Sequence, residues 1–543
     1  MKSLLLQRLA PGRAFLLCLV PAIAAAQVSP TCDESRELDK YQLLRRLSLD
    51  LRGKAPSYEE YLALDAQSAV PAATITSFVG SDDFRVVMRR YHEELFWPNV
   101  TNVALNNVNA QLVQLTAPDA WAISSAGKRR IFRGLSDINT VNGTQCGDFE
   151  QTQFTAGFVP VASAVRTVVV GTTTVKQEGW RMVTPYWSTT PIKVCAYDAM
   201  ETASVTVSGK VIACNTVDGD ARPECGCGPG LAYCYGPTAN VRTVIQQAMR
   251  EQLNLMVDRV STGGQPYTEL ITARNAPTNG PLVFWKKNLA PHLSYSRIVA
   301  LPDPNEPLTN ATWTDTTWRQ TDRGSALHAG VLTTPAYLLR FQTNRGRANR
   351  FRIDFECESF VPPSQLETAA NGCNEAGGDL TKRCTCRYCH RQLEPLAGHF
   401  GNFSEAGTTL MTDLTMFPRT KSTCVNNGGT FCNRFYVTDD SADNPGALLP
   451  YQYADSQHAD ITAALASGPR GRADEIISDG TFARCSVKRA WSYFMKRDMR
   501  LLGTDPEENA ALTALTTGFT TNNYSLPWLI ENIVSQPAYR RVR

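Results

Sequence analysis

The pentapeptide Cys386-Arg387-Tyr388-Cys389-His390 restricts the fold and chemistry of this chain more than any other feature. Its pattern, C-x-x-C-H, is the attachment signature of a c-type haem. Two thiols at that spacing can form thioethers with the two vinyl groups of one porphyrin, and the histidine that follows can bind the iron. The sequence therefore predicts one covalent haem c, attached through Cys386 and Cys389, with His390 as the proximal iron ligand.

The cysteines of this region also allow a second interpretation, a zinc site. Cys384, Cys386 and Cys389, together with a later cysteine, would supply four thiolates. This alternative does not explain why a histidine occupies the position that haem attachment requires. Haem is therefore the favoured prediction.

The first 26 residues have the pattern of a secretory signal peptide. Lys2, Arg8 and Arg13 provide a basic start, an apolar run follows at 14–20, and the small residues 24–26 form a cleavage site. Because haem is attached to c-type proteins outside the cytoplasmic membrane, we expect a bacterial protein exported to the periplasm, to the cell surface or into the medium. The apolar run is too short to cross a bilayer, and we expect no transmembrane span.

Composition indicates a globular chain with disulfides. The 543 residues suffice for several domains. A formal net charge of +3, from 54 basic and 51 acidic residues, favours neither nucleic acid nor an anionic membrane as a partner. Of 16 cysteines, one lies in the signal peptide and two in the haem motif, so 13 remain. We expect most of these 13 to form disulfides in an oxidising compartment.

Local patterns predict helices at both ends of the mature chain. Leucines at helical spacing run up to Gly53, a typical stop, and Ser57 with Glu60 forms a capping box. A further helix is expected over 240–259. Near the C-terminus, Asp505-Pro506 is an N-cap followed by a proline at the first helical position.

The middle of the chain differs in character from both ends. Segments 166–175, 192–195 and 204–207 are rich in β-branched residues and predict strands. Cysteines are frequent here, and those of the glycine-rich loop 225–234 are expected to pair in disulfides. The segment around the haem motif is expected to be rich in loops.

These patterns predict a mainly α, multidomain fold that is α+β overall, with a cytochrome c-like haem region and a β-rich, disulfide-braced insertion. The expected divisions are a signal peptide (1–26), an N-terminal helical domain (27–99), the β-rich, cysteine-rich insertion (100–236), a helical domain (237–345), the haem c region (346–455) and a C-terminal helical domain (456–543).

Five segments, in order along the chain, carry a family resemblance. They are LLRRLSLDLRG (43–53), YTELITA with NGP (267–273 and 279–281), AGVLTTP with RGR (329–335 and 345–347), CHRQLEPL (389–396), and FARC with IVSQPAY (482–485 and 533–539). Together they resemble the planctomycete-type cytochrome c-like proteins, secreted chains with serial domains of unknown function around a C-x-x-C-H. The resemblance implies a secreted c-type haem protein, and the insertion lies outside it.

The second axial ligand of the iron is not determined by the motif. His458, Met411 and Met416 follow the attachment site at distances that small cytochromes use, and His328 could also fold back toward the haem. His399 lies only nine residues after His390, too short a connection to reach the opposite face of the haem. His458, Met411 and Met416 are therefore the distal candidates.

The expected function is single-electron transfer through the haem, with an unidentified redox partner in the periplasm or at the cell surface. No nucleophilic triad, phosphate loop or dinucleotide fingerprint occurs, and no residue is predicted to be catalytic. A catalytic alternative would be a haem-dependent oxidoreductase, a peroxidase or oxidase with an open sixth iron position. A third alternative is a secreted binding or scaffold protein in which haem is a structural or redox element.

Overall fold

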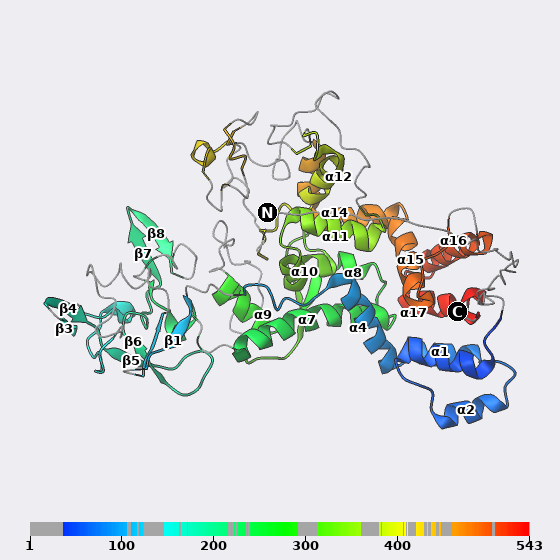
Figure 1. Ribbon diagram of the computed structural model, residues 1–543, viewed down its shortest axis with the longest axis horizontal. Helices are drawn as coiled ribbons and strands as arrows, with labels where there is room; N and C mark the ends of the chain where they lie inside the picture. The colour runs from blue at the N-terminus through cyan, green and yellow to red at the C-terminus, as the bar shows by residue number, and fades with distance from the viewer. Residues whose placement is uncertain are drawn as a thin grey trace, which may run out of the picture.

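Helices lie on both sides of a β-rich segment in the chain (Figure 1). The computed structural model describes residues 36–105, 110–116, 119–123, 146–161, 164–170, 172–214, 219, 222, 225–234, 236, 239–290, 312–359, 380–381, 383–405, 407–408, 410, 420–427, 432, 436–440, 445–446, 459–501 and 505–541. The predicted signal peptide and the distal candidates Met411, Met416 and His458 lie outside these residues.

The N-terminal helices begin and end where local signals place them. They are α1 (Lys40–Arg52), α2 (Tyr58–Asp65), α3 (Ala72–Val79) and α4 (Asp82–Phe96). Gly53 ends α1 in the left-handed region at φ 69°, which a residue without a Cβ adopts at little cost. Ser57 and Glu60 form the predicted capping box of α2, so both signals are confirmed.

The insertion contains short strands in several small sheets. They are β1 (Leu112–Gln114), β2 (Trp121–Ile123), β3 (Arg166–Val170), β4 (Thr173–Gln177), β5 (Trp180–Val183), β6 (Ile192–Cys195), β7 (Ser204–Val207) and β8 (Lys210–Ala213). One sheet has the order β1-β2-β6-β5, while β3–β4 and β7–β8 are antiparallel pairs. The run 166–175, expected as one strand, is instead divided between β3 and β4, with Val170 opposite Thr173. In the sequence, Gly171 interrupts the β-branched run, a signal for a break between strands.

Disulfides brace this segment as predicted. The pairs are Cys146–Cys195, Cys214–Cys225 and Cys227–Cys234. A small apolar core that includes Leu112, Val194 and Leu231 packs around the third pair. Figure 1 shows the strands gathered at one end of the molecule, with α1, α2 and α16 (Pro506–Thr521) toward the other end.

The rest of the described chain is mainly helical. Its elements are α7 (Ala239–Ser261), α8 (Glu269–Thr272), β9 (Asn275–Thr278), α9 (Gly280–Phe284), β10 (Arg319–Asp322), α10 (Pro335–Arg340), α11 (Asn344–Phe351), α12 (Arg387–Gly398), α14 (Ala459–Ser478), α15 (Thr481–Met495), α16, α17 (Leu526–Val534) and α18 (Pro537–Arg540). The helix expected over 240–259 is confirmed as α7. The side chain of Asp505 caps α16 by accepting from the N–H groups of Glu507 and Glu508, so this N-cap is also confirmed.

One hydrophobic core joins helices from both ends of the chain. Its buried members extend from Leu43 on α1 to Tyr539 on α18, with Trp285 and Trp491 fully enclosed. Ala397 and Phe400, at the end of α12, belong to the same core. The fold is thus mixed α+β, and the division of its helical part into domains stays a prediction. Among the described residues, no helix is both apolar enough and long enough to cross a bilayer.

The guanidinium of Arg347 joins three segments inside this core. The side chain is fully buried on α11 and donates to five backbone carbonyls and to Oδ1 of Asn344. The carbonyls belong to Leu338, Phe341, Phe403, Ser404 and Gly407, at 2.9–3.2 Å. Three of the five lie in the chain just after α12, so one side chain ties that segment to α10 and α11.

We predict that Arg347→Met destabilises the protein by at least about 3 kcal/mol, because several buried carbonyls lose their donor. Arg340→Met is the matched control. Arg340 lies on neighbouring α10 but is exposed, so its loss should cost less than about 0.5 kcal/mol. Urea unfolding followed by tryptophan fluorescence measures both. Equal stability of the two variants would contradict the role given to Arg347.

Candidate functional site

The C-x-x-C-H motif opens helix α12. Cys386 is the residue before the helix, and Cys389 and His390 lie in its first turn. The N–H of His390 donates to the carbonyl of Cys386 at 3.1 Å, which closes that turn. Residues three positions apart share one side of a helix, so both sulfurs lie on the same side of α12. The helix packs against α11 and α14, its neighbours in Figure 1.

The thiols of Cys386 and Cys389 differ from every other described cysteine. Both are free and partly exposed. The eleven other cysteines of the described residues are all in disulfides, Cys384 among them. A disulfide-bonded Cys384 cannot act as a thiolate ligand, so the zinc alternative loses one of its ligands. Among the described cysteines, the two that haem attachment would require are the two outside disulfides.

The ring of His390 is oriented by a buried carboxylate. Its Nδ1 lies 2.5 Å from Oε1 of Glu394, one helical turn further along α12. The side chain of Glu394 has no exposed surface, and the same Oε1 accepts from Nε of Arg345 on α11 at 2.7 Å. A hydrogen bond at Nδ1 fixes the tautomer and leaves Nε2 as the nitrogen available to a metal. This donor set fits a haem c iron.

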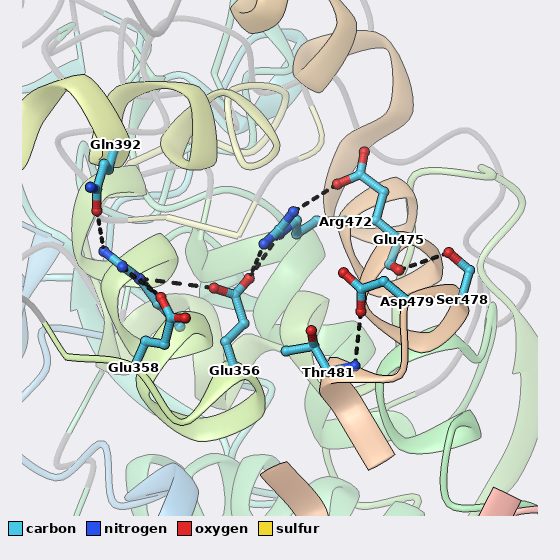
Figure 2. Close-up of polar contacts among 9 residues, drawn as sticks. Glu356, Glu358, Gln392, Arg472, Glu475, Ser478, Asp479 and Thr481 are labelled. Carbon is cyan, nitrogen blue, oxygen red and sulfur yellow. Dashed lines mark hydrogen bonds and ion pairs between the residues drawn. The ribbon is translucent and has the colours of Figure 1, made fainter. Parts of the chain in front are cut away.

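A polar network continues from the outer face of α12 (Figure 2). Arg352, in the π-helical turn Arg352–Glu356 that extends α11, donates to Oε1 of Gln392 on α12 at 2.8 Å. It also pairs with Glu358 at 2.6 Å. The side chain of Glu358 is more than half exposed, so this pair adds little to stability.

The network then reaches α14 through a buried acid. Nε of Arg472 donates to Oε1 of Glu356 at 2.8 Å, and Nη1 to Glu475 at 2.9 Å, as Figure 2 shows. Burial raises the pKa of Glu356, and the Arg472 cation opposes that rise. The disulfide Cys357–Cys485 then joins the end of the π-helical turn to α15. Ion pairs and the Cys357–Cys485 disulfide thus fix elements that surround α12.

Two histidines considered as distal ligands lie in the described part of the chain. His328 is buried, with its ring edge-on to Phe403 at 5.7 Å between centroids. His399 is also buried, and its Nδ1 lies 2.9 Å from the carbonyl of Gly468 on α14. Burial lowers the pKa of His399, which favours its neutral form. The contact with α14 fixes His399 against that helix.

Sequence reasoning did not find Glu394 and Arg345. Glu394 lies four residues after His390, a spacing that places both side chains on one helix face. That signal is present in the sequence, but it has meaning only if the segment is a helix. Arg345 comes from a different element and is brought to the site by the packing of α11 on α12.

We predict that Arg472→Met destabilises the protein by about 2–3 kcal/mol, because it leaves Glu356 buried without its main partner. The pKa of Glu356 is raised in the folded state, so an unpaired carboxylate costs more as pH rises. The loss of stability of the variant relative to the wild type should therefore grow between pH 5 and pH 8.

Arg470→Met is the control for this prediction. Arg470 lies on the same helix, pairs with Asp474, whose side chain is about half exposed, and also donates to the carbonyl of Thr272. None of these contacts involves a buried acid, so its loss should cost about 1 kcal/mol with little dependence on pH. Thermal unfolding of both variants across that pH range is the measurement, and parallel pH profiles would refute the prediction.

No family model, curated protein or solved structure matches this chain. The resemblance to planctomycete-type cytochrome c-like proteins therefore stays a prediction from the five sequence segments.

Proposed function

We propose that this protein is an exported monohaem c-type cytochrome-like protein that passes single electrons through a covalently bound haem. One observation carries the proposal. Cys386 and Cys389 are free although every other described cysteine is disulfide-bonded, and the histidine that directly follows Cys389 has its Nδ1 held by a buried carboxylate. The motif, its redox state and the orientation of the histidine support the same cofactor.

Each residue of the site has a defined task in this proposal. Cys386 and Cys389 bind the porphyrin as thioethers, and His390 offers Nε2 to the iron. Glu394 holds the imidazole in the tautomer that leaves Nε2 free. Bound haem supplies the chemistry, a one-electron change between ferric and ferrous iron. Ion pairs around α12 limit its movement. This suits an electron-transfer site, in which the iron changes charge while the protein around it rearranges little.

Export is part of the same proposal. The signal-peptide pattern of residues 1–26 and the disulfides both favour an oxidising compartment outside the cytoplasm. The electron donor and acceptor would then be periplasmic or cell-surface proteins. We further propose membership of the planctomycete-type cytochrome c-like family, on the five segments described above.

The first test concerns covalent attachment. In a host with c-type maturation, the purified protein should be coloured, and the haem should remain with the chain during acid–acetone extraction because thioethers are covalent. Cys386→Ser and Cys389→Ser should weaken or abolish this retention. Ser422→Ala, a substitution far from the motif in sequence, is the control and should retain haem. A colourless wild-type protein with stoichiometric zinc would refute the proposal.

The second test separates a carrier from a peroxidase. We expect a protein side chain at the sixth iron position, with His458, Met411 and Met416 as candidates. The ferric spectrum should then be low-spin, and carbon monoxide should bind slowly or not at all. Replacing the true ligand with Ala should convert the iron to high-spin and admit carbon monoxide. A high-spin wild-type protein with rapid peroxide turnover would favour a haem peroxidase instead.

A further inference from the structure

One carboxylate oxygen at the site is shared by two donors from different helices. Oε1 of Glu394 lies 2.5 Å from Nδ1 of His390 and 2.7 Å from Nε of Arg345. The other oxygen, Oε2, is buried and has no hydrogen-bond partner among the residues that the structure describes. The negative charge of Glu394 is therefore divided between an imidazole N–H and a guanidinium, with no exposure to solvent.

We infer that Arg345 and Glu394 set the reduction potential of the iron bound by His390, and that they act in opposite directions. A carboxylate bonded to Nδ1–H makes the imidazole a stronger electron donor, which stabilises ferric iron and lowers the potential. Arg345 withdraws charge from the same oxygen and weakens that effect. This inference rests on the proposed function.

The position of Arg345 is determined by the fold rather than by its own flexibility. Thr343 caps α11 by accepting from the N–H of Gly346, and Arg347 is fixed by its five carbonyls. Arg345 lies between these two anchors, on the α11 surface that packs against α12. Its side chain remains about one quarter exposed, so a substitution there removes charge without opening the core. Arg345 is thus a positioning residue that acts through Glu394.

The test uses the haem-loaded protein and measures midpoint potentials by redox titration. Glu394→Gln should shift the ferric/ferrous equilibrium about tenfold toward ferrous iron. For one electron, this is a rise in midpoint potential of about 59 mV. Arg345→Met should lower the potential, and Arg345→Lys should keep it near the wild-type value. Arg352→Met is the matched control, since it removes a cation that bonds α12 through Gln392 but not Glu394. Its potential should move much less.

A double-mutant cycle separates an effect of Arg345 that acts through Glu394 from a direct electrostatic effect of its charge on the iron. If Arg345 acts through the shared oxygen, Arg345→Met should shift the potential much less in a Glu394→Gln background than in the wild type. An equal shift in both backgrounds would overturn the inference while leaving haem attachment intact. Potentials that move in the same direction for Glu394→Gln and Arg345→Met would also overturn it.

A readout without haem distinguishes the two proposals. The chain has six histidines, so ¹⁵N-histidine spectra of the haem-free protein can resolve His390 by comparison with a His390→Gln variant. We expect the Nδ1–H tautomer in the wild type and a mixture of tautomers in Glu394→Ala. An Nε2–H tautomer in the wild type would overturn the inference even if haem is attached. Absence of haem from the matured chain would overturn both.

Discussion

The buried guanidinium of Arg347 is the interaction on which the geometry of the site depends. It donates to carbonyls before α11 and after α12, and its full burial makes every one of these bonds costly to break. One further bond, from the N–H of Asn344 to Oε1 of Glu405 at 2.8 Å, joins the start of α11 to the chain that follows α12. Arg345 lies two residues before Arg347, so the ion pair with Glu394 depends on the same bonds.

The electrostatics of the region fall into two classes. Glu394, Glu356 and Asp354 are buried acids, each within reach of an arginine from α11, the π-helical turn or α14. Burial raises the pKa of Asp354 to about 7, and Arg350 opposes the rise. Pairs such as Arg470–Asp474 lie at the surface and are screened by water. The buried class determines how α11, α12 and α14 pack, whereas the surface class adds little.

Signals confined to a few residues predicted the fold well. Gly53, the Ser57 box and the Asp505 cap act through hydrogen bonds within one turn, and each appears where the sequence places it. The strand expected over 166–175 was wrong in one respect. Its β-branched residues continue on both sides of Gly171, so residue preference alone did not separate two paired strands from one.

Features that need distant segments were not predictable in the same way. Cys357 and Cys485 are 128 residues apart, and only the packed fold brings their sulfurs together. Glu394 was missed because its segment was expected to be rich in loops, where a spacing of four residues has no meaning. The motif predicts Cys386, Cys389 and His390 as the haem site by its chemistry, while the partners that orient His390 required the helix and its neighbour.

The arrangement of Cys384, Cys386 and Cys389 has a consequence for how this protein is made. Within six residues, one sulfur is oxidised and two are not. A thiolate can attack a neighbouring disulfide, so Cys384, Cys386 and Cys389 can compete for the same partners. For a haem c protein, early pairing of Cys384 with either neighbour would block maturation. The yield of coloured protein would then depend on the relative rates of cysteine oxidation and haem attachment in the exporting cell, rather than on the stability of the finished fold.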